Sequence, residues 1–147
     1  MDNLEAVEIL IVEDNPVDAE MALRAFKKNN LTNQILVVGD GEEAIEFIFA
    51  KGKYANREKK IRPRIILLDL KLPKIDGLEV LKIIKENQET KSIPVIILTS
   101  SKEESDMVKS YQLGVNSYIV KPVDFDKFVE AIHELGLYWL LLNQQPK

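Results

Sequence analysis

The sequence predicts an α/β domain in which helices cover both faces of a parallel β-sheet. Five short β-branched runs alternate with five helical patterns along the 147 residues. The runs are apolar at successive positions rather than at every second one, which is typical of strands buried on both faces. Strands and helices that alternate in this way form parallel sheets with right-handed crossovers. Since a domain averages roughly 150 residues, we expect a single domain over residues 1–147.

The predicted strands are the segments richest in isoleucine, valine and leucine. Such side chains fit the buried, pleated surface of a sheet. Each segment is short and is followed by a helical pattern, as a doubly wound arrangement requires. The strands are expected at Val7–Val12, Ile35–Val38, Ile65–Leu68, Val95–Leu98 and Tyr118–Val120.

Capping signals mark where the helices begin. Asn15 is a good N-cap and is followed by Pro16, which suits the first helical position. That first helix is expected to end near Asn29. Asp40 and Glu43 have the spacing of a capping box, which opens the second helix. The other three helices are predicted to begin after Asp76, Ser101 and Asp124, and the fourth to stop at Gly114.

Two segments are longer than this pattern needs. Residues 51–64 form a connection rich in lysine and arginine with one acid, Glu58, and we interpret it as a solvated loop. A second interpretation is docking to an acidic surface of a partner protein through Lys59 and Lys60. Residues 137–147 extend the last helix.

The last helix carries more apolar residues than one packed face needs. One set has the spacing of a face packed on the sheet, and a second set covers other directions. Because contiguous exposed apolar surface usually marks an interface, we predict a symmetric homodimer, or a partner contact, through this helix and its extension. The first set is Phe125, Phe128, Val129, Ile132, Leu135 and Trp139, and the second is Leu137, Tyr138, Leu140, Leu141 and Leu142.

Composition excludes several classes of protein. The chain has no cysteine and one histidine, His133, which excludes disulfides, thiol catalysis and cysteine- or histidine-rich metal sites. Its 20 basic and 24 acidic residues give a net charge of −4, which argues against a nucleic-acid partner. The N-terminus shows no secretory signal, and the longest nearly apolar stretch falls short of the roughly 20 residues of a membrane helix. We therefore expect a cytoplasmic protein.

Polar side chains follow four of the predicted strands. Glu13 and Asp14 follow the first, Asp69 the third, Thr99 the fourth and Lys121 the fifth. Ligands of open α/β sheets bind beyond the carboxyl ends of the strands, so these groups should converge. Three adjacent carboxylates repel one another, and magnesium (Mg2+), which prefers oxygen ligands, is the natural resolution.

The same groups are suited to phosphoryl chemistry. Asp69 can act as a nucleophile that forms an aspartyl-phosphate. Lys121 supplies a compact positive charge for phosphate oxygens, and the Thr99 hydroxyl supplies a hydrogen-bond donor. No glycine-rich phosphate loop follows the first strand, so a nucleotide-binding domain is not expected.

Four segments, in this order and each at a strand end, carry a family resemblance over about residues 6–135. They are Ile9–Asn15, Leu67–Gly77, Ile96–Ser101 and Tyr118–Pro122. Together they resemble the response-regulator receiver domains of two-component signalling. The resemblance implies a flavodoxin-like sheet with strand order 2-1-3-4-5.

The resemblance also implies roles for individual residues. Asp69 matches the residue that accepts a phosphoryl group from a sensor histidine kinase. Thr99 and Tyr118 match the two switch residues, and Lys121 matches the lysine that binds phosphate, with a cis bond to Pro122. The Mg2+ ligands implied are Glu13, Asp14, Asp69 and the main-chain carbonyl of Lys71.

A finer resemblance concerns small stand-alone regulators partnered with bacterial phytochrome kinases. It rests on the segments 69–74 and 132–140 and on the basic connection. With one domain, output is expected through protein contacts, through onward phosphotransfer or through action as a phosphate sink. The resemblance places the protein contacts on the face of the fourth helix, fifth strand and fifth helix.

Two alternatives differ in class. An aspartate-nucleophile phosphohydrolase needs a second acid two residues after the nucleophile, and Lys71 stands there, so substrate turnover is not expected. A phosphorylation-independent interaction module with the same fold is the other alternative. The intact set of Glu13, Asp14, Asp69 and Lys121 argues against it.

Overall fold

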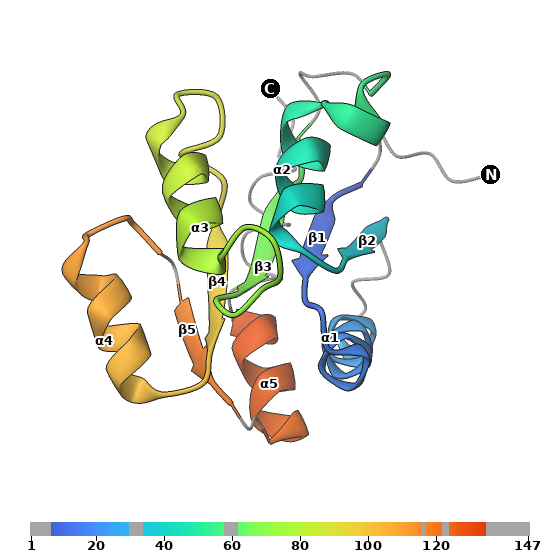
Figure 1. Cartoon of the computed structure of the whole chain (residues 1–147). Helices are drawn as coiled ribbons and strands as arrows, with labels where there is room; N and C mark the ends of the chain where they lie inside the picture. Colours follow the sequence, from blue (N-terminus) through green and yellow to red (C-terminus); the bar gives the residue numbers. More distant parts are fainter. Residues whose placement is uncertain (1–6, 30–33, 58–61, 116, 122–123, 135–147) are drawn as a thin grey trace, which may run out of the picture.

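In the computed structural model, a central sheet lies between two layers of helices (Figure 1). The structure describes residues 7–29, 34–57, 62–115, 117–121 and 124–134. All strand pairs are parallel, and the order is β2-β1-β3-β4-β5, as predicted. The strands are β1 (Ile9–Val12), β2 (Ile35–Val38), β3 (Ile65–Asp69), β4 (Val95–Thr99) and β5 (Ser117–Val120).

The two helical layers bury separate apolar clusters against the sheet. One layer, α1 (Pro16–Lys28) and α5 (Phe125–Ile132), contributes Phe26 and Phe128 to its cluster. The other layer contributes Phe47, Leu81 and Val108 to the opposite cluster. Because β1, β3 and β4 are buried along their whole length, their successive apolar residues serve both clusters. The second layer consists of α2 (Gly41–Phe49), α3 (Gly77–Glu86) and α4 (Lys102–Ser110).

The predicted caps hold two helices in place directly after their strands. The Asn15 side chain accepts hydrogen bonds from the backbone N–H groups of Val17, at 2.8 Å, and Asp18, at 3.1 Å. The Asp40 carboxylate accepts one from the Glu43 N–H at 2.7 Å. These bonds satisfy N–H groups that the first turn of a helix leaves unpaired.

Three predicted strand bounds differ from the observed ones by one residue, at the ends of β3 and β4 and at the start of β5, and two other predicted boundaries differ by more. The first strand begins at Ile9, although Val7 before it is buried. The fourth helix ends at Ser110 and not at Gly114. There the Tyr111 N–H bonds to the Val108 carbonyl, and Gln112 takes a left-handed backbone conformation with φ 53°, which the helix cannot continue through.

The basic connection is less solvated than the sequence suggested. Arg57 is 8% exposed, and its guanidinium donates to the carbonyls of Phe47 and Ile48 at the end of α2. A short 3-10 helix, η2 (Gly52–Tyr54), leads to it. Arg62 pairs with Glu89 at 2.9 Å, while Lys59 and Lys60 lie outside the described residues.

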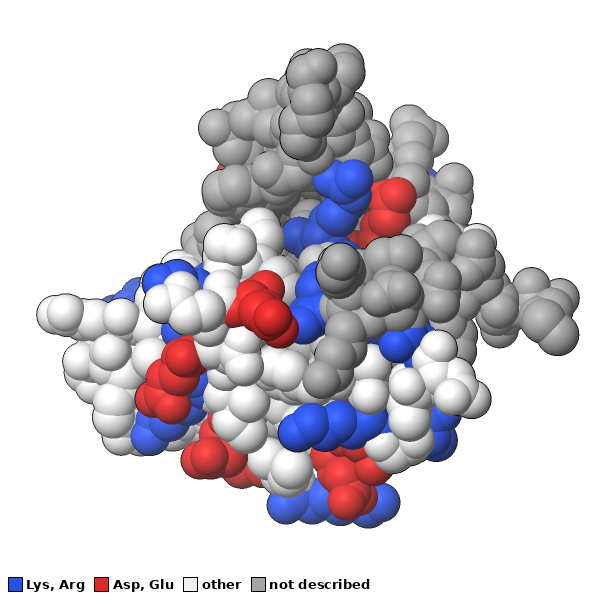
Figure 2. Space-filling model, turned by 90° about the horizontal axis from the view of Figure 1, so that it is seen from above, with Lys and Arg blue, Asp and Glu red and all other residues white. Residues whose placement is uncertain are grey.

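The surface in Figure 2 shows lysine and arginine interspersed with acidic residues. Over the described part of this face, no continuous basic surface is visible. On the described part of this face, the two signs of charge are therefore mixed.

The packed face of the last helix is as predicted where it is described. Phe128 and Ile132 are buried, and Phe125 and Val129 are partly buried against the same cluster. The extension 137–147, with its apolar residues, lies outside the described residues, as does Pro122. Among the described helices, none has the length and hydropathy to cross a membrane.

Candidate functional site

Three carboxylates meet at the carboxyl edge of the sheet. Glu13 and Asp14 follow β1, and Asp69 is the last residue of β3, the next strand in the sheet. One carboxylate oxygen from each lies within 4.8 Å of the others. Glu13 and Asp69 are buried, whereas Asp14 is exposed. The convergence expected from the strand ends is therefore present.

Lys121, one residue beyond β5, reaches into this acidic edge. Its Nζ atom lies 2.8 Å from Asp69 Oδ2, 3.1 Å from Glu13 Oε1 and 3.0 Å from Asp18 Oδ2. Burial alone lowers the pKa of Lys121, but its bonds to Asp69, Asp18 and Glu13 outweigh burial and raise it. The ammonium is therefore held charged between three acids.

The acidic edge keeps an excess of negative charge. Burial, and next the neighbouring Asp69, raise the pKa of Glu13 to about 7, although Lys121 acts in the opposite direction. One ammonium thus does not neutralise these carboxylates. A group of crowded oxygen ligands with unbalanced negative charge fits a hard divalent cation such as Mg2+.

The loop after β3 holds Asp69 from the other side. The Lys71 N–H donates to Asp69 Oδ1 at 3.1 Å, while Asp69 Oδ2 faces Lys121. Gly77 N–H bonds to the Leu70 carbonyl at 2.9 Å, which folds the loop back on itself. A Cβ atom on Gly77 would lie 2.3 Å from the Asp69 carbonyl oxygen, so this close approach requires glycine.

Thr99 closes β4 and is fully buried. Its hydroxyl lies 2.5 Å from Glu104 Oε1 and 3.1 Å from the Ser101 carbonyl. The Ser100 N–H donates to the same Glu104 oxygen at 3.0 Å. The Thr99 hydroxyl, predicted to donate a hydrogen bond to phosphate, is therefore bonded to the first turn of α4.

Tyr118 lies on the same side of the sheet as Thr99. It pairs with Ile97 in the parallel register, two pairs before Thr99 and Val120. The ring is partly buried, and burial raises the pKa of its hydroxyl. Lys109 Nζ lies 5.0 Å from the ring centre, which ties Tyr118 to α4.

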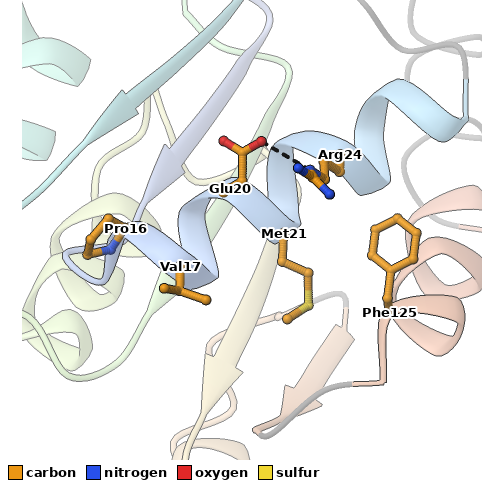
Figure 3. Close-up of a pocket in the computed structure, with 6 residues that line it drawn as sticks. All are labelled: Pro16, Val17, Glu20, Met21, Arg24 and Phe125. Atoms are coloured by element: carbon orange, nitrogen blue, oxygen red, sulfur yellow. Dashed lines mark hydrogen bonds and ion pairs between the residues drawn. The ribbon is translucent and has the colours of Figure 1, made fainter.

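An apolar pocket of about 550 Å3 lies on the α1 and α5 side (Figure 3). Val17, Met21 and Phe125 point toward it, and an ion pair between Glu20 and Arg24 lies along its wall. Val17 is 72% exposed, so the pocket opens to solvent. Asp18, which contacts Lys121, is the next residue after Val17 on α1.

The structure brings together most of the predicted site residues and adds two. Glu13, Asp14, Asp69 and Lys121 form one cluster, and Thr99 and Tyr118 lie on the strands beside it. The added residues, described above, are Asp18 and Glu104. Asp18 could have been found because it lies four residues after Asp14, in the first turn of the helix that follows. Glu104 is three residues after the N-cap Ser101, a capping-box position, but its bond to Thr99 has no sequence signal.

A parallel sheet in this order, with an acidic edge, a threonine and a lysine at its strand ends, defines the receiver class of α/β domains. The sequence matches the response regulator receiver domain over residues 9–133, and the chain belongs to this family. The resemblance expected from the four strand-end segments is confirmed.

Its relatives include stand-alone phytochrome response regulators. The solved structure of the bacteriophytochrome response regulator RtBRR is 50% identical, with a TM-score of 0.82, over 96% of this chain and 84% of that one. The phosphorylated cyanobacterial phytochrome response regulator RcpA is 37% identical, with a TM-score of 0.78, over 97% and 99%.

Response regulator Rcp1 from Synechocystis sp. is 38% identical over 90% of this chain and 88% of its own length. A solved structure of Rcp1 is a Mn2+-bound form, which aligns at 36% identity with a TM-score of 0.78, over 96% and 99%. The finer resemblance to phytochrome regulators, expected from residues 69–74 and 132–140, is thus confirmed at the level of relatives.

Proposed function

We propose that this chain is a stand-alone response regulator that accepts a phosphoryl group on Asp69 from a sensor histidine kinase. The observation that carries the proposal is the position of Asp69, with one carboxylate oxygen 2.8 Å from Lys121 and its side chain within the acidic cluster. Membership of the receiver family and similarity to RcpA, solved in a phosphorylated form, support it.

In the proposed reaction, a carboxylate oxygen of Asp69 attacks the phosphorus of a phosphohistidine. The new O–P bond forms as the N–P bond breaks, and the imidazole leaves with the electron pair and then takes up a proton. Lys121 stays bonded at the site and offsets the charge of the phosphoryl oxygens. Thr99 donates a hydrogen bond to one of those oxygens.

Glu13, Asp14, Asp69 and the main-chain carbonyl of Lys71 are the proposed ligands of Mg2+. The carboxylate oxygens lie within 4.8 Å of one another, and the raised pKa of Glu13 reflects burial and crowded charge that a cation would relieve. A bound divalent ion supplies charge neutralisation for phosphoryl transfer between anions.

The proposed output is a change in protein contacts on the α4-β5-α5 face. Thr99 and Tyr118 connect the site to this face, since both contact residues of α4. Large apolar side chains are exposed here: Met107 at 44%, Tyr111 at 47% and Val120 at 41%. Exposed apolar residues gathered on one face favour a protein partner.

The proposed phosphodonor is a histidine kinase of the phytochrome type. Similarity to phytochrome response regulators supports this choice. The open apolar pocket beside Asp18 gives a donor helix a surface next to the site. A homodimer through the last helix and its extension, and a cytoplasmic location, remain predictions. No observation favours a phosphohydrolase, because exposed Lys71 stands where such an enzyme has its second acid.

A phosphotransfer assay tests the proposal. A purified phytochrome-type histidine kinase, labelled with radioactive phosphate, is mixed with the wild-type chain and with Asp69→Asn in Mg2+ buffer. We expect rapid transfer of label to the wild type and none to the variant. Absence of transfer from this kinase to the wild type would reject the phytochrome link, and equal labelling of the variant would reject Asp69 as the acceptor.

A further inference from the structure

Glu104 makes bonds that a helix cap does not need. In a capping box, the glutamate three residues after the N-cap bonds back to the N-cap N–H. Here the N-cap is Ser101, whose hydroxyl accepts from the Glu104 N–H at 3.1 Å. The Glu104 carboxylate reaches past it to the Ser100 N–H, at 3.0 Å, and the Thr99 hydroxyl, at 2.5 Å.

Those two donors lie at the carboxyl end of β4, beside the end of β3 that carries Asp69. Asp69 pairs with Leu98 in the sheet, and the Leu70 N–H bonds to the Leu98 carbonyl at 3.0 Å. Thr99 and Ser100 therefore follow directly beside Asp69. A hydroxyl donates one hydrogen, so Thr99 cannot serve Glu104 and a phosphoryl oxygen together.

The Glu104 carboxylate is ionised when it holds these donors. Burial raises its pKa, but the bonds from Thr99 and Ser100 and the charge of nearby Lys71 outweigh burial and lower it. A phosphoryl group adds a charge of roughly −1.5 to −2 at neutral pH. Like charges sharing the same donors repel, so the two anions compete.

We propose that Glu104 is a latch that holds Thr99 and Ser100 in the unphosphorylated chain and must release them when Asp69 is phosphorylated. The inference rests on the proposed function and adds a positioning residue to it. Because Glu104 belongs to the first turn of α4, its release removes one attachment of that helix to β4. The latch thus connects phosphorylation to the exposed face of α4.

Binding of beryllium fluoride, a stable phosphoryl mimic, tests the latch in the full chain with Mg2+. Bound fluoride is followed by fluorine NMR in the wild type, Glu104→Ala, Glu104→Gln and the control Glu103→Ala. Glu103 is exposed in the same helical turn and shares its charge. We expect Glu104→Ala to bind about tenfold more tightly, as for loss of one hydrogen bond to a charged group, and the control to match the wild type. Glu104→Gln should lie between them.

A second comparison separates the latch from a loosened helix. In a Thr99→Ala background, the gain from Glu104→Ala should fall to about threefold or less, since only the exposed Ser100, through its N–H at 3.0 Å and its hydroxyl at 3.3 Å, is left to release. A gain that is unchanged by Thr99→Ala, or no gain at all in the original background, would overturn the latch. A wild-type chain that binds no beryllium fluoride would instead overturn the proposed function, and the latch with it.

Discussion

At Glu13, burial and neighbouring charge act together. The side chain is 3% exposed, and Asp69 lies beside it with Lys121 as the shared cation. Asp18 draws the same ammonium toward α1 at 3.0 Å. Each carboxylate therefore receives only part of one positive charge. This shortage explains both the raised pKa of Glu13 and the suitability of the cluster for a divalent ion.

The raised pKa of Glu13 predicts a pH dependence in Mg2+-free buffer. The pKa of Glu13 is about 7 in the folded chain, whereas its ordinary value, taken for the unfolded chain, is 4.5. Between pH 4.5 and pH 7, the folded chain therefore holds a proton on Glu13 that the unfolded chain has lost. The stability that this group contributes is therefore full below pH 4.5 and is lost as pH rises through 7. Urea unfolding with a chelator should show the wild type losing stability relative to Glu13→Gln from pH 5 to pH 8.

Parallel stability profiles of the two proteins would contradict this view of Glu13. Added Mg2+ should reverse the trend, since metal binding requires the deprotonated carboxylate and therefore strengthens as pH rises.

At the scale of elements, the loop between β3 and α3 is held between two glycines. Gly41 at the start of α2 leaves no room for a Cβ atom, which would lie 1.9 Å from the Ile75 carbonyl oxygen. A Cβ atom on Gly77, at the start of α3, would likewise overlap backbone atoms of Asp69 and Leu70. The loop that carries Lys71 is thus fixed from both ends by backbone contacts.

Replacing Gly77 by alanine should disturb the site. The added methyl group would overlap the Asp69 carbonyl, and such overpacking costs about 1–3 kcal/mol. We expect reduced stability in urea and slower phosphorylation by a small phosphodonor. Gly39→Ala is the matched control, because nothing lies within 4 Å of a Cβ atom there. If Gly77→Ala behaves like the control, the loop is not fixed as described.

Arg57 gives a second prediction at this scale. Its guanidinium stacks on Phe47, with Cζ 4.4 Å from the ring centre, and pairs with two carbonyls at the end of α2. Arg57→Ala leaves buried carbonyls without this donor and should lower the unfolding free energy by about 2–3 kcal/mol. Lys53→Ala, which removes an exposed ion pair with Glu43, should cost less than about 1 kcal/mol. Equal losses in thermal or urea unfolding would show that Arg57 is no more than a surface residue.

At the scale of the whole molecule, the strand order creates the site. All strands are parallel, in the order β2-β1-β3-β4-β5, so their carboxyl ends share one edge of the sheet. Residues far apart in sequence, such as Glu13 and Lys121, meet at that edge. The two helical layers leave that edge and the outer face of α4 and β5 open. A change at this edge of the sheet can therefore reach the exposed face of α4 and β5 through the adjoining ends of β4 and β5.

Much of this could be predicted from the sequence. Apolar runs and capping residues predicted the strands and most helix starts. The polar residues that follow the predicted strands indicated the acidic cluster and Lys121. The end of α4 could not be predicted, because it depends on the backbone conformation of Gln112. Nor could Arg57 be recognised as buried, since its partners are carbonyls of α2 that only the folded chain brings near. The bond from Thr99 to Glu104 depends in the same way on how α4 meets β4.

The last prediction at this scale concerns the oligomeric state of the chain. Apolar residues of the last helix and its extension exceed what one packed face uses, so we expect a homodimer in solution. Light scattering at micromolar concentration should give twice the mass of one chain. Leu141→Glu, in the extension, should shift that mass toward the monomer, with Lys147→Glu as a control. A monomeric wild type would contradict the dimer.

The most direct test of the central claim is the intact mass of the chain after incubation with Mg2+ and a small-molecule phosphodonor. The wild type should gain the mass of one phosphoryl group, and the gain should disappear in Asp69→Asn or when a chelator is added. A folded wild-type chain that gains no mass, beside a working control receiver, would contradict the proposed phosphorylation of Asp69 and favour a phosphorylation-independent interaction module.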